Sequence, residues 1–234
     1  MKLDVLKRLN QVRADREAAV LVTDVSSGAE RLVVERDGYD DDPLRDEIET
    51  RLRSGRSGMV TTEAGEVFLT VSVPPPRLIV IGAVHISQAL APMARVAGFD
   101  MTVVDPRTAF ATPERFPDVL VIAEWPDDVL PRIGLDRFTA LAALTHDPKI
   151  DDGGLTTALA AGCFYVGALG SRKTHGRRLE RLRAAGVTED ALARIHAPIG
   201  LPIGAQSPAE IAVAVLAQVI DALRRRDVPR EAAA

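Results

Sequence analysis

The sequence predicts an α/β protein with a doubly wound parallel sheet, preceded by a small α+β domain. Residues 77–234 alternate apolar strand patterns with helix patterns, which is typical of a parallel sheet covered by helices on both faces. Residues 1–76 instead show pairs of strand patterns around short turns. Pro74-Pro75-Pro76 lies between the two parts, and such a run favours a short, stiff spacer. We therefore expect domains at residues 1–73 and 77–226.

Composition excludes several other classes of protein. The chain has 234 residues, of which 47% are hydrophobic and 26% charged, with a net charge of −4. These values predict a globular core and exclude disordered, collagenous and coiled-coil chains. The longest apolar runs, 78–81 and 212–217, are too short to span a bilayer, and the N-terminus lacks the apolar stretch of a secretory signal. We therefore expect a cytoplasmic protein without a membrane contact.

Charge is distributed unevenly between the two parts. Residues 1–76 hold 11 basic and 15 acidic side chains, whereas residues 77–234 hold 18 of each, together with all four histidines. The mild overall acidity argues against a nucleic-acid partner. It does not argue against a small anionic ligand, because the second part is balanced in charge.

The first part has the pattern of a small α+β unit. Apolar spacing predicts a helix over residues 2–17. The elements predicted after it are a hairpin of 19–25 and 31–35, a helix over 43–53, and strands over 59–62 and 67–73. The acidic run Asp40-Asp41-Asp42 is interpreted as a solvated loop rather than a cation site.

The second part alternates strands and helices. Residues 78–81 are continuously apolar, as expected of a strand buried on both faces. The other predicted strands are 101–104, 119–123, 139–144, 164–169 and 195–199. Helices are predicted up to residue 97, near 152–161, over 171–185 and from 207 to 225, with a disordered tail over 224–234. In open parallel sheets, ligands bind beyond the carboxyl ends of the strands, so the residues that follow each strand are the candidates.

The turn after the first strand has the placement of a dinucleotide fingerprint. Gly82 supplies the first glycine of G-x-G-x-x-G, but Val84 and Ser87 replace the other two. The second glycine normally lets the backbone approach a pyrophosphate, so Val84 disfavours NAD(P). Free amides at the helix start can still bind an anion. Alternatively, the segment is a tight turn in which His85 has a capping role.

Polar residues also follow the second and fourth strands. Asp105 lies 23 residues beyond Gly82, close to the spacing of an acid that binds a ribose hydroxyl, and Arg107 follows it. This pair can hold a ribose or a phosphate, or it can be a local ion pair or helix cap. His146 is a candidate base or ligand-binding residue oriented by Asp147. Alternatively, Asp147 begins a turn and His146 packs.

The stretch after the fifth strand is the most informative. Gly170 precedes Ser171, a candidate N-cap, and Arg172 and Lys173 then occupy the first helical turn, where the helix dipole disfavours cations. A bound anion would resolve this conflict, because helix starts and basic side chains both favour phosphate. The alternative is a solvated basic face.

The single cysteine, Cys163, excludes an internal disulfide and any multi-cysteine zinc site. It adjoins apolar residues, which indicates a buried structural cysteine rather than one that handles sulfur. The spacing of the histidines defines no zinc site, so we expect no bound metal.

Seven segments resemble, in order, the C-terminal Rossmann domain of the XdhC/CoxI family, and together they cover about residues 77–222. These segments are 78–82 with His85, 102–107, 115–117, 144–148, 165–172, 194–200 and 207–212. In that family, the fingerprint positions of Val84 and Ser87 usually hold glycine. The family's N-terminal domain usually carries a Gly-Gly-Cys motif, whereas residues 1–76 contain no cysteine.

The resemblance implies an accessory protein of a molybdenum hydroxylase, of the xanthine dehydrogenase or carbon monoxide dehydrogenase type. Such proteins bind the molybdenum cofactor (molybdopterin or its dinucleotide form), assist its sulfuration and pass it to the apoenzyme. It implies a hydroxylase apoenzyme and a cysteine desulfurase as partners, a homodimer, and a non-enzymatic role.

Residues and resemblance together give one hypothesis and two alternatives. The expected cofactor-binding residues are Gly82, His85, Asp105, Arg107, His146, Gly170, Ser171, Arg172 and Lys173. One alternative is an NAD(P)-dependent oxidoreductase that uses the same cleft. The other is an interaction protein with a vestigial site. No catalytic residue is assigned.

Overall fold

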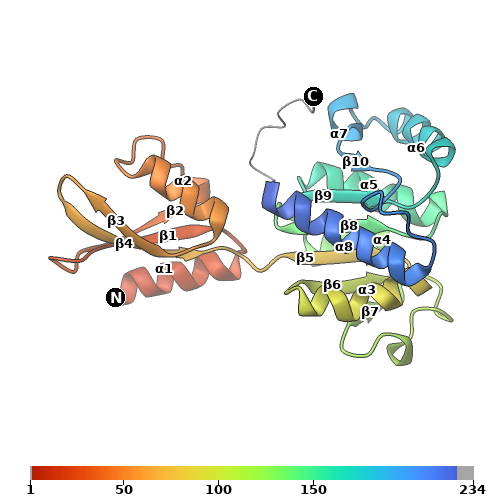
Figure 1. The fold of residues 1–234 in the computed structure, drawn as a ribbon, viewed down its shortest axis with the longest axis horizontal. Helices are drawn as coiled ribbons and strands as arrows, with labels where there is room; N and C mark the ends of the chain where they lie inside the picture. Colours follow the sequence, from red (N-terminus) through yellow and green to blue (C-terminus); the bar gives the residue numbers. More distant parts are fainter. Residues whose placement is uncertain (1, 226–234) are drawn as a thin grey trace. The chain divides into compact units, whose positions relative to one another are not determined.

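The computed structural model describes residues 2–225, which divide into two compact units, one up to Pro74 and one from Pro75 onward (Figure 1). No helix among the described residues is long and apolar enough to cross a membrane.

The N-terminal unit is a four-stranded antiparallel sheet with two helices. Its elements are α1 (Leu3–Ala14), β1 (Ala19–Asp24), β2 (Glu30–Val34), a 3-10 turn (Glu35–Asp37), α2 (Arg45–Ser54), β3 (Gly58–Thr62) and β4 (Gly65–Ser72). The strand order is β2-β1-β4-β3. The first four residues of the central strand β1 are all buried, as expected of a strand covered on both faces. Val12 of α1 packs on Ala19 and Val34.

The acidic run was wrongly predicted to be solvated throughout. Asp42 accepts two hydrogen bonds from the Arg31 guanidinium and one from the Leu44 amide, 2.9 Å away, so it ties the loop to β2 and to the start of α2. Its side chain is only 12% exposed. A carboxylate can accept several donors at once, which explains how one residue of a charged run becomes structural.

The second unit is a six-stranded, fully parallel sheet, which confirms the predicted fold class. Its strands are β5 (Arg77–Ile81), β6 (Asp100–Val104), β7 (Leu120–Ile122), β8 (Thr139–Ala143), β9 (Tyr165–Ala168) and β10 (Ile195–His196), in the order β10-β9-β8-β5-β6-β7. Its helices are α3 (His85–Val96), α4 (Pro126–Ile133), α5 (Pro148–Ala160), α6 (Arg172–Ala184), α7 (Glu189–Leu192) and α8 (Pro208–Arg225), with a 3-10 turn at Pro113–Arg115. The order reverses between β5 and β8, the topological switch point at which doubly wound sheets bind ligands.

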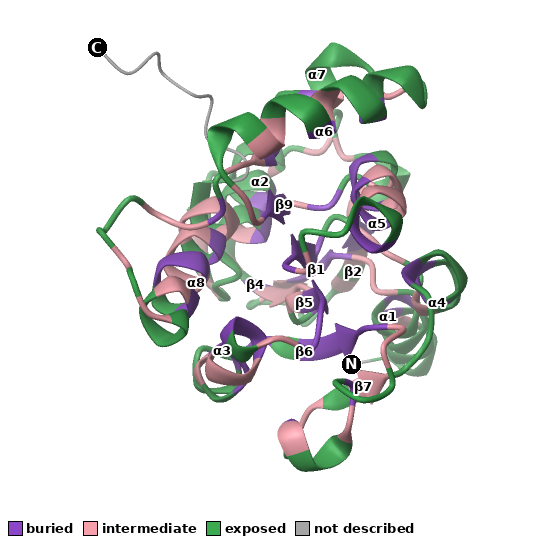
Figure 2. Ribbon diagram, turned by 90° about the vertical axis from the view of Figure 1, so that its right-hand side faces the viewer, coloured by how far each residue is buried: buried purple, intermediate pink, exposed green. Residues whose placement is uncertain are grey.

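Two apolar layers cover the sheet. Leu78 and Val80 of β5 face the cluster that includes residues of α3 and α8, whereas Ile79 and Ile81 face the cluster that includes residues of α4 and α5. This alternation follows from the two-residue period of a strand. Figure 2 shows the purple, buried strands of the sheet between partly exposed helices.

Several predicted elements differ from the structure. The sixth strand ends at His196 rather than residue 199, because Pro198 has no N–H for a ladder. Helix α5 begins at Pro148, four residues before the predicted start, because Asp147 caps it and proline suits the first turn. Helices α4 and α7 were not predicted. Helix α8 ends at Arg225, as predicted, so Arg224 and Arg225 do not belong to the predicted disordered tail; the rest of that tail, 226–234, lies outside the described residues.

Candidate functional site

The turn between β5 and α3 requires a glycine at position 82. Its φ is +114°, and a Cβ there would lie 2.8 Å from Thr145 Cγ2. Thr145 follows β8, so the missing side chain lets the ends of the two switch-point strands come into contact. The Gly82 amide donates to the Val104 carbonyl oxygen of β6 at 2.9 Å, which ties a third strand end to the same place.

The two non-glycine positions of the fingerprint have distinct consequences. Ser87 is fully buried and its hydroxyl donates to the Gly82 carbonyl oxygen, so it ties α3 to the turn. In the usual fingerprint, a third glycine at this position allows the helix to pack closely on the strand. Val84 is the N-cap of α3 and gives its first amides no side-chain acceptor. His85 is exposed at the first helical position, and the side-chain capping role considered for it is not observed.

Asp105 is buried and its carboxylate is saturated with donors. One oxygen accepts from the Arg107 backbone amide and Nε, both at 2.9 Å, and the other accepts from the Ala83 amide and Arg107 Nη2, both at 2.7 Å. Burial opposes ionisation, but these donors outweigh it and lower the pKa of Asp105. Four donors fill the lone-pair sites of a carboxylate. The local ion pair considered from the sequence is therefore present, and it fixes both the Gly82 turn and the Arg107 side chain.

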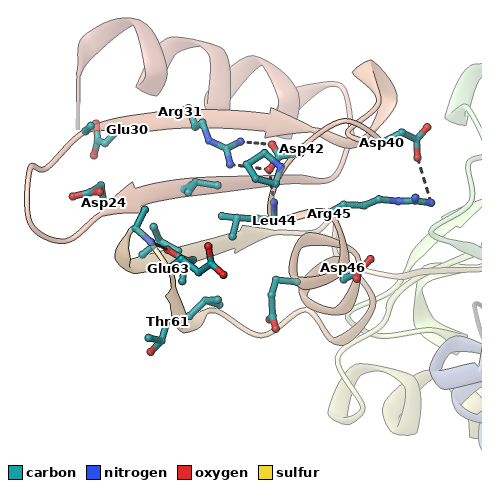
Figure 3. Close-up of a pocket in the computed structure, with 18 residues that line it drawn as sticks. Asp24, Glu30, Arg31, Asp40, Asp42, Leu44, Arg45, Asp46, Thr61 and Glu63 are labelled. Atoms are coloured by element: carbon teal, nitrogen blue, oxygen red, sulfur yellow. Dashed lines mark hydrogen bonds and ion pairs between the residues drawn. The ribbon is translucent and has the colours of Figure 1, made fainter.

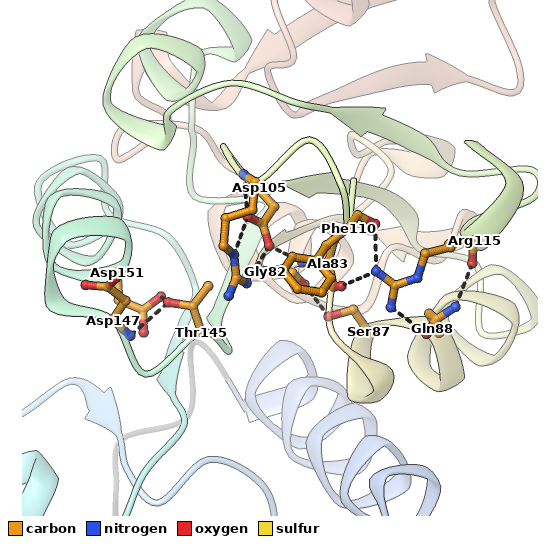
Figure 4. Close-up of polar contacts among 11 residues, drawn as sticks. Gly82, Ala83, Ser87, Gln88, Asp105, Phe110, Arg115, Thr145, Asp147 and Asp151 are labelled. Carbon is orange, nitrogen blue, oxygen red and sulfur yellow. Dashed lines mark hydrogen bonds and ion pairs between the residues drawn. The ribbon is translucent and has the colours of Figure 1, made fainter. Parts of the chain in front are cut away.

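Arg115 is a second arginine at this turn, which the sequence did not single out (Figure 4). Its Nη1 donates to the Ala83 and Phe110 carbonyl oxygens, at 3.0 and 2.8 Å, and its Nη2 donates to Gln88 Oε1 at 2.9 Å. It therefore joins the loop after β6 to the start of α3. Only the fold brings these segments together; the 115–117 family resemblance was the one signal available.

The loop after β8 is ordered by two aspartates. The Thr145 hydroxyl donates to Asp151 Oδ1 at 2.7 Å and accepts from the Asp147 amide at 3.0 Å (Figure 4). Asp147 caps α5 by accepting from the Lys149 amide at 3.0 Å, so it begins the helix rather than orienting His146. His146 is exposed, has a left-handed backbone with φ of +66°, and has its Nδ1 3.7 Å from where a Cβ on Gly170 would lie.

The start of α6 has the predicted geometry. Gly170 adopts φ of +132°, and Ser171 caps the helix by accepting from the Thr174 amide at 3.2 Å. Arg172 and Lys173 are exposed in a first turn without any acid. Asp147 and Asp151, near the start of α5, act on Arg107: both help to raise the pKa of Arg107, after the larger effect of its hydrogen bonds to Asp105.

The carboxyl edge of the sheet therefore gathers the expected residues from neighbouring strands. The order along this edge is Asp105 after β6, Gly82 after β5, His146 after β8 and Gly170 after β9.

Cys163 precedes β9 and so belongs to the opposite end of the strands. It is buried, and burial raises the pKa of its thiol to about 12, so it is a structural cysteine.

A groove of about 1030 Å³ in the N-terminal unit is chemically different (Figure 3). Its lining includes seven acids, among them Asp24, Glu30, Asp40, Asp46 and Glu63, against two arginines, and Arg45 lies 3.5 Å from Asp40. Such a lining repels anions. An anionic ligand is therefore better matched by the second unit.

Within the described part of the chain, no group of three or more His, Cys, Asp or Glu side chains is placed to hold a metal ion.

Fold and sequence define an XdhC-type Rossmann domain. The family model described as "XdhC Rossmann domain" matches residues 78–219, and the chain belongs to this family, as the resemblance predicted. It is 36% identical over 161 residues to the uncharacterised protein YqeB of Escherichia coli, 32% identical to a probable xanthine dehydrogenase subunit of Bacillus subtilis, and 31% identical to the molybdenum cofactor insertion chaperone PaoD of Escherichia coli.

These relatives are longer proteins. The matches cover 67%, 68% and 62% of this chain but 29%, 46% and 40% of the respective relatives, so the chain spans less than half of each. This chain is also similar to the crystal structure of a xanthine dehydrogenase from Bacillus halodurans, with a TM-score of 0.66 and 24% identity. The match covers 97% of this chain and 66% of the Bacillus halodurans chain. At that identity the likeness supports the fold alone.

Proposed function

We propose that this protein is an accessory factor of a molybdenum hydroxylase that binds the molybdenum cofactor and assists its maturation or insertion. The proposal rests on the carboxyl edge of the parallel sheet in an XdhC-type Rossmann domain. At this edge lie the Gly82 turn and the basic first turn of α6. One relative is named a molybdenum cofactor insertion chaperone and another a probable xanthine dehydrogenase subunit.

The residues at this edge fit an anionic cofactor. Gly82 lets Thr145 pack against the turn after β5, and the first amides of α3 have no side-chain cap, so they can donate to an anion. Arg172 and Lys173 place two exposed cations at the start of α6, where a phosphate would also meet helix amides. In this role, His85, His146, Gly170 and Ser171 line the ligand, Arg107 contacts it, and Asp105 positions Arg107 and the Gly82 turn.

The same geometry disfavours an NAD(P)-dependent oxidoreductase. Val84 occupies the position at which a pyrophosphate normally approaches a glycine, and the Asp105 carboxylate has no lone pair left for a ribose hydroxyl.

We propose a non-enzymatic protein of the cytoplasm. Its proposed partners are a hydroxylase apoenzyme and a cysteine desulfurase, and its proposed assembly is a homodimer.

Titration of the purified protein with molybdenum cofactor tests this proposal. Arg172→Ala should weaken binding by about 1.5–3 kcal/mol, the value of a hydrogen bond to a charged group. Arg95→Ala is the matched control, because Arg95 is exposed on α3 and its side chain pairs with the exposed Asp118. Tight binding of NAD(H) or NADP(H) with hydride transfer would contradict the proposal. Unchanged affinity in Arg172→Ala would remove that residue from the site.

A further inference from the structure

A pocket of about 340 Å³ lies between the first turns of α5 and α6, in the second unit. We call it the α5–α6 pocket; its lining is His146, Pro148, Asp151, Asp152, Lys173, Thr174, Arg177, Arg178 and Arg181. Its volume is in the lower part of the range of small-molecule sites. It shares His146 and Lys173 with the proposed cofactor site, but most of its lining belongs to neither the Gly82 turn nor the Asp105 pair.

The wall of this pocket contains a buried guanidinium with unused donors. Arg178 is 2% exposed, and its Nη2 donates to the Leu169 carbonyl oxygen at 2.8 Å. Its Nε and Nη1 are buried and have no hydrogen-bond partner in the described structure. Buried donors without partners are costly, and an arginine with two of them is ready for an acceptor with several oxygens.

A buried carboxyl faces the same region. Asp151 is 1% exposed, its Oδ1 accepts from Thr145, and its Oδ2 has no partner among the residues described. Burial raises the pKa of Asp151 to about 6, although Thr145 and the charge of Arg178 pull it down. Burial likewise lowers the pKa of Arg178, against the attraction of Asp151 and Asp152. The two buried groups therefore offset one another in charge while both keep unused polar atoms.

The charge balance of the lining leaves a surplus of two positive charges. Four cationic side chains face two carboxyls. Asp152 is neutralised by Arg181, whose Nε and Nη2 donate to its two oxygens at 2.6 and 3.1 Å. Asp151 offsets Arg178, so Lys173 and Arg177 remain, and neither forms an ion pair with any residue of the described chain. A phosphate monoester carries about −1.5 to −2 at neutral pH, which matches this surplus.

We propose that the α5–α6 pocket binds a phosphate monoester, with Lys173, Arg177 and Arg178 as donors to its oxygens. The start of α6 adds its dipole to the same place. The pocket is wider than a phosphate alone requires, so it also admits part of the organic group that bears the phosphate. The inference rests on the proposed function only for the identity of the larger ligand, because the phosphate chemistry follows from the pocket itself.

Calorimetric titration of the full chain with inorganic phosphate and with phenyl phosphate tests the inference. We expect both to bind, and phenyl phosphate to bind more tightly because the pocket admits its organic part. Lys173→Gln and Arg177→Gln should each weaken both ligands about tenfold, which corresponds to about 1.4 kcal/mol. Both side chains are exposed, so these variants should fold. Arg183→Gln is the matched control on the same helix; Arg183 pairs with Glu189 outside the pocket and should change affinity less than twofold.

The inference would be overturned by no binding of either phosphate compound, or by unchanged affinity in both glutamine variants. Tighter binding of inorganic phosphate than of phenyl phosphate would overturn the monoester assignment. Titration of the same variants with molybdenum cofactor separates this inference from the proposed function. If the protein binds the molybdenum cofactor but neither phosphate compound, the pocket assignment is wrong and the accessory role stands. If the protein does not bind the cofactor, and the glutamine variants lose phosphate binding, the pocket assignment stands and the accessory role is wrong.

Discussion

At the scale of single residues, Asp151 makes stability depend on pH. Its pKa rises from 3.8 to about 6 because burial opposes its ionisation. The native carboxyl therefore holds its proton more tightly than the unfolded one, so its contribution to stability is complete below about pH 4 and is lost as pH rises through about 6. A change of this size corresponds to about 3 kcal/mol.

Asp151→Asn should therefore gain stability relative to the wild type between pH 4 and pH 7.5, by up to about 3 kcal/mol. The asparagine oxygen can still accept from Thr145. Urea unfolding at several pH values measures the difference. Asp100→Asn, at an exposed position of the same unit, should follow the wild-type curve. A constant difference between Asp151→Asn and the wild type across this range would show that Asp151 titrates normally.

At the scale of elements, the start of α6 depends on its cap. Ser171 accepts from the Thr174 amide at 3.2 Å, and no acid in the first turn compensates for the cations there. Ser171→Ala should lower the free energy of unfolding by about 0.5–2 kcal/mol, and Ser171→Asp should restore it, because aspartate caps equally well. Equilibrium denaturation measures both changes. Equal stability of the alanine variant and the wild type would show that the cap contributes little.

The elements also show what sequence can and cannot predict. Strands β5 and β8 were found because a strand buried on both faces is continuously apolar, and α6 because Ser171 is a recognisable cap. Helix α4 was missed because it has eight residues and prolines at 126 and 131, which obscure helical periodicity.

The sequence predicted which residues lie at the site better than it predicted which atoms those residues contact. The strand-end rule selected Gly82 and Asp105 because their places follow from local pattern. The sequence left open whether Asp105 binds a ligand or pairs with its neighbour Arg107, and it did not show that the fold brings the Ala83 amide within 2.7 Å of Asp105. Arg115 and Arg178 resembled ordinary surface cations in the sequence, because the carbonyl oxygens that they contact belong to other segments.

At the scale of the whole molecule, three apolar clusters of the described residues are each built from one part of the chain. The two clusters of the parallel sheet contain only residues between 78 and 223, and the cluster around Val12 contains only residues of the N-terminal unit. A domain of roughly 150 residues buries enough surface to fold alone, whereas one of about 75 residues is marginal. We therefore propose that the Rossmann domain is an autonomous folding unit.

A chain that begins at residue 75 and ends at residue 234 should then fold by itself. Its amide spectrum should overlay that of the same residues in the full-length protein, and it should unfold cooperatively, because both of its cores are complete without residues 1–74. Heteronuclear NMR and thermal unfolding measure these two properties. The shortened chain should also retain phosphate binding, since the whole lining of the α5–α6 pocket lies within it. A spectrum with collapsed dispersion, or unfolding without a cooperative transition, would show instead that the N-terminal unit is needed to form the parallel sheet.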